Sequence, residues 1–409
     1  MNPSPTTSTA PVSRRLFLAG VPAVLLAAAG CGAASGAASP ASPSAASTAS
    51  AAGPAASGGV AALAQAFYRT LDADQQSTVL LDYSLANAKR WSNLPQGLLT
   101  GDGGGMPSGS MPSASMPSGG PGAGSDAPGG GPGGGGGASQ SRVGINLGAL
   151  DDQQLAAFTT LLKAATGSAS GLGYDELEQQ LNADDYLGTH GGGDTYGRKN
   201  FYVALLGSPS DSGTWEFQFG GHHMAVANTY VDGQLAGATP SFRGVEPNTA
   251  FELNGRTNQP LRVKQAAFTA LLAGLSADQL ATAKLTDTFT DLVLTPGKDW
   301  QFPASRSGVK VSTLSAGQKK LTLAAIATYV DDIADDDAKT ILARYEGELD
   351  STSVAWSGTT ALTEQNDYVR IDGPSVWIEF SMQHGIVLSG NHPHSVWRDR
   401  STDYGGTKS

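Results

Sequence analysis

Histidine is the residue type in this chain whose spacing points most directly to chemistry. Five of the six histidines fall in two places, the pair His222-His223 and the C-terminal His384, His392 and His394. In an extended segment, His392-Pro393-His394 would place both imidazoles on one face about 7 Å apart, because each residue advances the strand by about 3.3 Å. Such a pair can hold one metal ion with further ligands from elsewhere. We therefore take His222, His223, His392 and His394 as candidate metal ligands, with one of the first two facing the site.

Charged residues near the histidines are candidates for the other roles at such a site. Glu379, a short loop before the histidine pair, is a candidate carboxylate ligand or general base. Arg370 and Arg398 are candidate anion clamps, and Asp399 follows in the same motif as Arg398. Zinc would suit a hydrolase with an open coordination position, whereas copper would suit a redox or carrier role. A metal-free site and purely structural histidines remain the alternatives.

Other catalytic and metal-binding patterns find less support. The only cysteine is Cys31, and neither a Gly-x-Ser-x-Gly elbow nor a Gly-rich phosphate fingerprint occurs. The aspartates between 331 and 337 lack the spacing of a calcium-binding EF-hand loop. Three Met-Pro-Ser repeats within residues 106–118 could offer thioether ligands to Cu(I), but we interpret them as repeat expansion in a disordered loop.

The first 30 residues are predicted to be an export signal that is not part of the fold. Arg14 and Arg15 precede an apolar run of about 14 residues, which is too short to span a bilayer. Ser13-Arg14-Arg15-Leu16-Phe17-Leu18 resembles the twin-arginine signal, an ordinary secretory signal being the alternative. The run ends at Ala28-Ala29-Gly30-Cys31, which resembles a bacterial lipobox. We therefore expect an acylated Cys31 that anchors an extracytoplasmic body to the membrane.

The composition of the residues after the predicted export signal indicates how they are organised and which partners they can bind. Residues 31–57 are rich in Ala, Ser and Pro and are predicted to form a flexible stalk. Residues 101–139 form a Met/Gly-rich insertion in a single domain that spans 58–409. The net charge of −11 becomes −13 when Arg14 and Arg15 are removed, and no basic cluster occurs. Binding to nucleic acid through its phosphates is therefore excluded, and a small-molecule ligand fits better.

Two recurring patterns predict the elements that position the candidate residues. Capping boxes begin at Asp72, Asp151, Ser276 and Ser315, each with glutamine three residues later. Strand-like runs cover 201–206, 215–219 and 224–231, with a hairpin at Asp232-Gly233, and later 354–356, 368–371 and 376–380. The order of helices, strands, helices and strands predicts an α+β fold with helices packed on a largely antiparallel sheet.

Two local features concern the histidines themselves. Gly220-Gly221 before His222 indicates a β-bulge or a close backbone approach. Pro393 stiffens the histidine pair but argues against placing it in a central strand, because proline lacks the N–H that a ladder needs.

Five separated motifs resemble the family of domains of unknown function numbered 3500. They are Arg90-Trp91-Ser92-Asn93-Leu94-Pro95, Phe219-Gly220-Gly221-His222-His223, Pro240-Ser241-Phe242 with Gly244 and Glu246-Pro247, Gly373-Pro374 with Glu379, and His392 and His394 with Trp397-Arg398-Asp399 and Asp403-Tyr404-Gly405. The resemblance covers roughly residues 60–405 and implies an identity without a reaction.

Our working hypothesis is therefore a surface-tethered, metal-assisted hydrolase. A non-catalytic protein that binds a small molecule or metal is the first alternative, and a structural envelope protein is the second.

Overall fold

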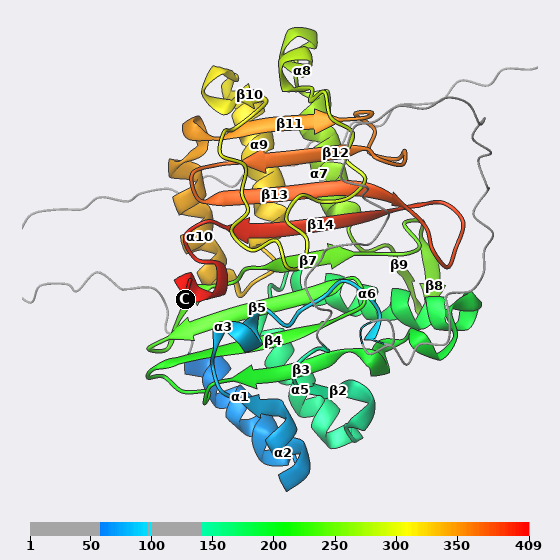
Figure 1. Ribbon diagram of the computed structural model, residues 1–409, viewed down its shortest axis with the longest axis vertical. Coiled ribbons are helices and arrows are strands. Elements are labelled where there is room, and N and C mark those ends of the chain that lie inside the picture. The colour runs from blue at the N-terminus through cyan, green and yellow to red at the C-terminus, as the bar shows by residue number, and fades with distance from the viewer. Residues whose placement is uncertain (1–57, 97–98, 100–140, 409) are drawn as a thin grey trace, which may run out of the picture. The chain divides into compact units, whose positions relative to one another are not determined.

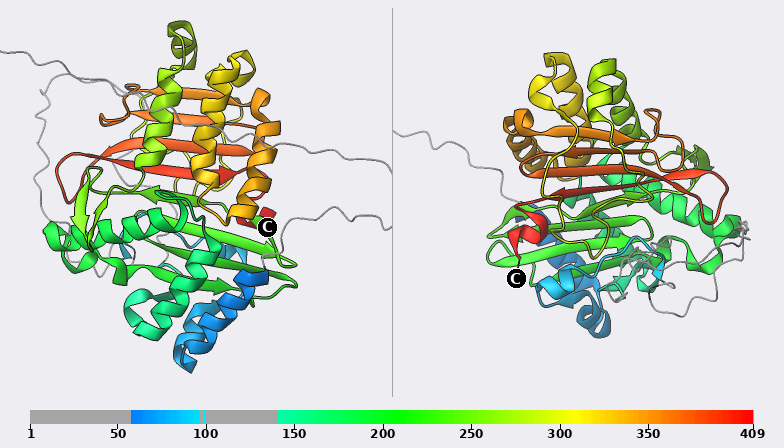
Figure 2. Two further views of the ribbon diagram at one scale, coloured as in Figure 1. Left: turned by 180° about the vertical axis from the view of Figure 1, so that it is seen from behind. Right: turned by 45° about the horizontal axis from the view of Figure 1, so that its top comes forward.

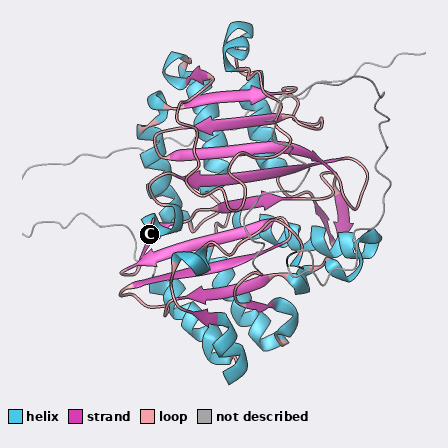
Figure 3. Cartoon of the chain, in the orientation of Figure 1, coloured by secondary structure: helices cyan, strands magenta, loops and turns pink. Residues whose placement is uncertain are grey.

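The computed structural model describes residues 58–96, 99 and 141–408 of the chain. The predicted export signal, Cys31, the stalk and the Met/Gly-rich insertion at 101–139 lie outside the described residues. Within these, helices pack against one large sheet in which almost all strand pairs are antiparallel (Figure 3). The predicted α+β class is therefore confirmed.

The sheet has twelve strands, in the spatial order β1, β3, β4, β5, β7, β14, β13, β12, β11 and β10, with β2 paired to β3 and β6 to β5. Only β1 and β3 are parallel. The strands are β1 Leu80–Leu81, β2 Ile145–Asn146, β3 Tyr202–Leu206, β4 Thr214–Gly221, β5 Met224–Val231, β6 Gln234–Gly237, β7 Ser241–Gly244, β10 Val309–Lys310, β11 Ser353–Ser357, β12 Tyr368–Asp372, β13 Val376–His384 and β14 Asn391–Asp399, with a separate hairpin of β8 Phe251–Leu253 and β9 Arg256–Asn258. Each predicted strand is present.

Nine α-helices occur in the described part of the chain. They are α1 Gly58–Thr70, α2 Ala73–Val79, α3 Leu85–Ala88, α5 Asp152–Ala165, α6 Gly173–Leu187, α7 Arg262–Ala273, α8 Ala277–Ala283, α9 Ala316–Val330 and α10 Asp335–Gly347. The view from behind shows α7, α9 and α10 lying across β11–β14 (Figure 2). The opposite face of these strands is crossed by the segment 285–308 between α8 and β10 (Figure 1). Among the described residues, no helix is long and apolar enough to cross a membrane.

The four predicted capping boxes are all formed, at the starts of α2, α5, α8 and α9. Their glutamines also join the helices in pairs. Gln154 Nε2 donates to Gln75 Oε1 at 2.7 Å, and Gln318 Nε2 donates to Gln279 Oε1 at 2.7 Å. Each box therefore both satisfies the free N–H groups of its helix and fixes one helix start against another.

The described chain consists of two halves with a similar order of elements, apart from β1, α3 and β6 of the first half and the hairpin of β8 and β9 between the halves. The first half runs α1, α2, β1, β2, α5 and α6 and then β3, β4, β5 and β7, and the second runs α7, α8, β10, α9 and α10 and then β11 to β14. The halves lie side by side in the sheet with opposite strand order. They meet where β7 pairs with β14, and this junction is antiparallel, as an approximate twofold axis requires.

Individual contacts repeat between the halves. Arg142 donates from Nη2 to the carbonyl oxygen of Gly221, which precedes the turn between β4 and β5. Arg306 donates from Nη2 to the carbonyl oxygen of Gly373, which precedes the turn between β12 and β13. The two halves can therefore be compared position by position.

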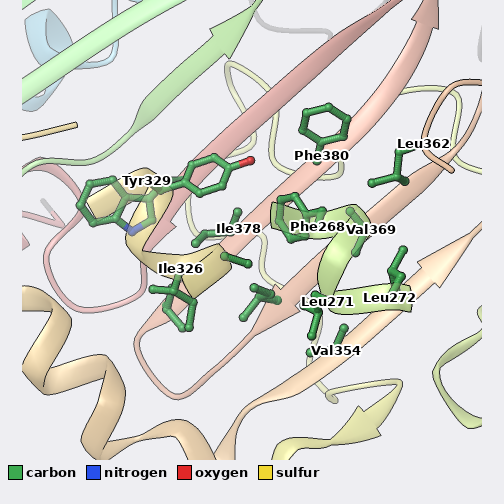
Figure 4. Close-up of a cluster of buried hydrophobic side chains, with 14 of the residues drawn as sticks. Phe268, Leu271, Leu272, Ile326, Tyr329, Val354, Leu362, Val369, Ile378 and Phe380 are labelled. Carbon is green, nitrogen blue, oxygen red and sulfur yellow. The ribbon is translucent and has the colours of Figure 1, made fainter. Parts of the chain in front are cut away.

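The hydrophobic core on the helical face has one part in each half. In the second half, Phe268 and Leu271 of α7 and Tyr329 of α9 pack on Ile378 and Phe380 of β13 (Figure 4). In the first half, helices α1, α5 and α6 pack on β3–β5. Full burial of one such side chain contributes about 1.5–3 kcal/mol to stability. Packing of the helices therefore stabilises the strands whose other face carries the candidate residues.

Candidate metal centre

Three histidines from the middle and the C-terminal part of the sequence converge at the junction of the halves. His394 Nε2 lies 3.1 Å from His223 Nε2 and 3.3 Å from His392 Nε2. One ring nitrogen from each residue lies within 4.8 Å of the other two. Two nitrogens about 2.0–2.1 Å from a tetrahedral zinc ion are about 3.3 Å apart. The two distances to His394 Nε2 therefore already match those between ligands of one ion.

His392 and His394 share a face because they alternate along β14. The expectation that Pro393 argues against a central strand is wrong, because β14 lies between β13 and β7. Val245 N donates to Pro393 O, so the proline carbonyl points toward the β7 side. Its nitrogen points the same way, where β7 has already ended at Gly244, so the missing N–H lies beyond the paired residues of β7.

His223 is held by its backbone at the turn between β4 and β5. Its φ is 59°, its N–H donates to Asn93 O, and its C=O accepts from Gly244 N at 2.7 Å. The ladder runs without a bulge to the pair Gly221–Met224. Of the two predicted features, the structure shows the close approach, since a Cβ atom on Gly221 would lie 2.5 Å from the Phe201 ring.

The segment 90–95 and Arg142 form the support of this turn. Arg142 Nη2 donates to the carbonyl oxygens of Ser92 and Gly221, both at 2.8 Å. Burial lowers the pKa of Arg142 to about 10. One guanidinium thus ties the segment to the turn that carries His223. Sequence reasoning found the motif at 90–95 but missed Arg142, whose partners are backbone carbonyls that leave no pattern.

Asp291 supports the cluster from outside. His394 Nδ1 donates to Asp291 Oδ1 at 3.1 Å, which leaves the Nε2 lone pair of His394 directed at the cluster. Burial acts to raise the pKa of Asp291, but the His394 ring and the Leu292 amide outweigh it, and the pKa is lowered. A carboxylate on the outer nitrogen of a histidine is the usual arrangement behind a metal ligand. Sequence reasoning missed Asp291, which lies in a segment without periodicity.

His222 lies beside the cluster rather than in it. Its ring stacks on His223 with centroids 3.7 Å apart, and its Nδ1 lies 2.6 Å from Asp184 Oδ1. A cavity of about 10 Å³ adjoins the two histidines, which is room for about one water molecule. Its lining also includes Asp184, Gly244 and Glu246. Of the candidate pair, His223 is therefore the residue that joins His392 and His394.

Glu379 lies on the same sheet face as the histidines, but its oxygens are engaged elsewhere. They accept hydrogen bonds from Leu294 N at 2.9 Å, Tyr368 OH at 2.8 Å and Trp377 Nε1 at 2.7 Å, and from Val293 N. Four donors occupy the carboxylate, so the structure does not bring it to the histidines. The carboxylate beside them is that of Asp291.

Arg398 and Asp399 are buried in structural networks. The Arg398 side chain is fully buried and pairs with Asp403 and Asp299, at 2.8 and 2.9 Å. Asp399 accepts from Tyr345 OH at 2.6 Å and pairs with Arg344. These contacts hold the C-terminal strand and the segment 285–308 in place, and they leave neither side chain exposed to a ligand.

Arg370, the remaining candidate, and His384, which was not a candidate ligand, also lie apart from the cluster. Arg370 lies opposite Glu379 in the ladder between β12 and β13. Its guanidinium lies over the Trp377 ring, 5.3 Å from the ring centroid. His384 ends β13 and is exposed. The structure thus brings together three of the candidate residues and places the remainder in separate contacts.

The other half shows what the fold itself requires at this turn. The turn between β12 and β13 is Pro374-Ser375, and Arg400 N donates to Ser375 O as Gly244 N donates to His223 O. The equivalent backbone hydrogen bond forms there without histidine, although Ser375 does not share the positive φ of His223. This hydrogen bond therefore does not depend on an imidazole at the turn, which favours a functional role for His223.

Comparison with known proteins gives a family and no reaction. A family described as Protein of unknown function (DUF3500) matches residues 137–406, which is about two thirds of the 409 residues. The motif at 90–95 lies outside the matched residues. No curated protein and no solved structure matches the chain.

Proposed function

The chain belongs to the DUF3500 family, and we propose that it binds a divalent metal ion through His223, His392 and His394 and uses the ion in hydrolysis. The observation that supports this is the convergence of three imidazole nitrogens within 4.8 Å, with Asp291 on the outer nitrogen of His394. Each ring is at least nine-tenths buried, so the groups are sheltered from bulk water.

The donor set favours zinc. Burial and the neighbouring imidazoles lower the pKa of His223 and His392 well below its usual value, which favours the neutral ring that binds metal. Three nitrogen ligands with a fourth position for water are typical of catalytic zinc sites, where the ion makes its bound water acidic and polarises a carbonyl. Copper(II) also binds imidazole strongly and is the competing metal.

A non-catalytic metal-binding role is the second candidate. The cavity that adjoins His222 and His223 has room for about one water molecule, whereas sites for small organic ligands are several hundred Å³. A protein that stores or carries the ion needs no larger space. Activity on small ester, phosphate and glycan substrates distinguishes the two roles once the metal is established.

We also propose that the protein is exported and anchored at Cys31 by a lipid. The twin-arginine-like segment, the short apolar run and the lipobox-like residues before Cys31 support this. A Cys31→Ala variant is expected to leave the membrane fraction and to lose labelling by a fatty-acid analogue. Equal membrane retention and equal labelling of the variant would contradict lipid anchoring.

Elemental analysis of protein purified without an affinity tag tests the metal site. We expect about one metal ion per chain in the wild type, and its loss in a His392→Ala, His394→Ala double variant, because two of three ligands are removed. His384→Ala is the matched control, since His384 is exposed on the neighbouring strand. Wild-type protein that contains no metal and binds none added would sink the proposal.

A further inference from the structure

We propose that Glu379 is a positioning residue of the metal centre, because it fixes the backbone of Val293 and Leu294 and thereby holds Asp291 against His394. This inference rests on the proposed function. It assigns Glu379 a role at the same site that is neither metal ligation nor proton transfer.

The first step is the saturation of the Glu379 carboxylate. Its side chain is fully buried and accepts from two backbone amides, one hydroxyl and one indole N–H. No lysine or arginine among the described residues forms an ion pair with it, although Arg370 lies opposite in the ladder. Four donors surround two oxygens, so a proton on either oxygen would face a donor. The network therefore selects the ionised carboxylate, although burial raises the pKa of Glu379.

The second step is what the carboxylate holds. Residues 285–308 connect α8 to β10 without a helix or strand, and this segment crosses the sheet face that carries the histidines (Figure 1). Both amides that Glu379 accepts come from consecutive residues of this segment, Val293 and Leu294. Asp291 stands only two residues earlier, so the anchor limits where its carboxylate can lie.

The third step is the contact that depends on this anchor. Asp291 accepts from His394 Nδ1 at 3.1 Å, and its side chain is 39 % exposed. Besides His394, the carboxylate accepts from Leu292 N of its own irregular segment. Its position against His394 is therefore set by the backbone beside it, and that backbone is fixed by Glu379.

The first half shows that the shared fold does not require this anchor. The position equivalent to Glu379 is Ala227, 152 residues earlier, as Met224 is 152 residues before Val376. In that half, Gln218 Nε2 donates to Ala88 O, so the covering segment is held through a carbonyl. At this position of the sheet, the carboxylate that binds the amides of the covering segment is therefore present in the half that carries Asp291, and alanine takes its place in the other half.

The test compares Glu379→Gln with Asp291→Asn in the full chain. The side-chain amide introduced by Glu379→Gln would present a donor to a backbone N–H, so we expect both variants to lower zinc affinity about 10- to 100-fold. We also expect both to shift the visible spectrum of bound Co(II) in the same direction. The double variant should lose little more than either single variant, because both act through one contact.

Asp367→Asn is the matched control. Asp367 is fully buried and accepts from the amides of Thr363 and Glu364, both at 2.9 Å, on a different loop. It should retain the wild-type affinity and Co(II) spectrum even if it lowers stability. Trp377→Phe removes a single donor to Glu379 and serves if Glu379→Gln does not fold, with a smaller shift of the same kind expected.

The nitrogen NMR signals of His394 provide a readout without metal. In metal-free protein, Glu379→Gln and Asp291→Asn should both change the signal of Nδ1, because both weaken its hydrogen bond to the carboxylate. Wild-type affinity, an unchanged Co(II) spectrum and an unchanged Nδ1 signal in Glu379→Gln would overturn the inference while leaving the metal site intact. Failure of the wild type to bind metal would instead overturn the proposed function.

Discussion

A Lys264→Met variant is expected to unfold with a free energy about 3–5 kcal/mol lower than the wild type, because it leaves buried carboxylates without their partner. Lys264 Nζ lies 2.7 Å from Glu176 Oε1 and 3.0 Å from Asp332 Oδ1, and the three side chains are almost completely buried. Arg243 is the fourth member and lies farther away, at 3.5 Å from Asp332 and 3.7 Å from Glu176. Methionine keeps the length of the side chain and removes its charge.

Chemical unfolding of the variant and two companions measures this effect. Lys339→Met is the matched control, since Lys339 pairs with Asp336 on the surface and should lose at most about 1 kcal/mol. Adding Glu176→Gln to Lys264→Met should recover part of the loss, because Arg243 and Asp332 then balance each other. A loss below about 1 kcal/mol in Lys264→Met would show that the cluster does not depend on this cation.

A Glu216→Gln variant is expected to abolish a large part of the pH dependence of stability. Burial raises the pKa of Glu216 to about 7, against the lowering effect of hydrogen bonds from Thr229 and Gln218. A raised pKa in the folded state stabilises the fold at low pH, and this contribution is lost as the pH rises from about 4.5, the usual pKa of the group, through 7. The difference between these two pKa values corresponds to about 3 kcal/mol in the free energy of unfolding.

Glutamine can keep both contacts, accepting from Gln218 and donating to Thr229, while it cannot ionise. The free energy of unfolding should therefore fall less between pH 4.5 and pH 8 in Glu216→Gln than in the wild type, by about 3 kcal/mol. The free energy of unfolding is measured at both pH values for both proteins. Titrating groups that the two proteins share contribute equally, so the difference between the proteins reports Glu216 alone. Identical slopes for the two proteins would show that Glu216 titrates near its usual pKa.

Local signals in the sequence were sufficient for the elements and for the histidine pair. Each capping box contains its own partners within four residues, so the starts of α2, α5, α8 and α9 depend on no distant contact. The alternation of Trp215, Phe217 and Phe219 with polar residues identified β4 because successive side chains point to opposite faces, although Glu216 and Gln218 are buried as well. His392 and His394 face the same side for the same reason.

The partners of these residues across the fold could not be predicted in the same way. Glu379 carries no mark that distinguishes a metal ligand from a carboxylate that binds backbone amides. Asp291 reaches His394 through a segment without regular structure, over 103 positions of sequence. The effect of Pro393 was misjudged because it depends on where β7 ends. The proline nitrogen faces the β7 side of β14 at a position that β7 no longer covers.

The repeat of the two halves was present in the sequence but obscured by spacing. The two capping boxes of the first half begin 79 residues apart, at Asp72 and Asp151, and those of the second half 39 apart, at Ser276 and Ser315. The difference of 40 residues is nearly the length of the Met/Gly-rich insertion at 101–139. Removing that insertion would have brought the two patterns into register.

The two halves are joined in the sheet through the short strand β7, and the histidine cluster lies beside this connection. β7 joins β5 through the pairs Met224–Arg243 and Ala225–Phe242, and joins β14 through four pairs. His223 belongs to the first half, and His394, 171 positions later in the sequence, belongs to the second. If the proposed ion is bound, it would cross-link the two halves beside the four residue pairs of their junction. On the proposed function, metal binding would then strengthen the association of the two halves.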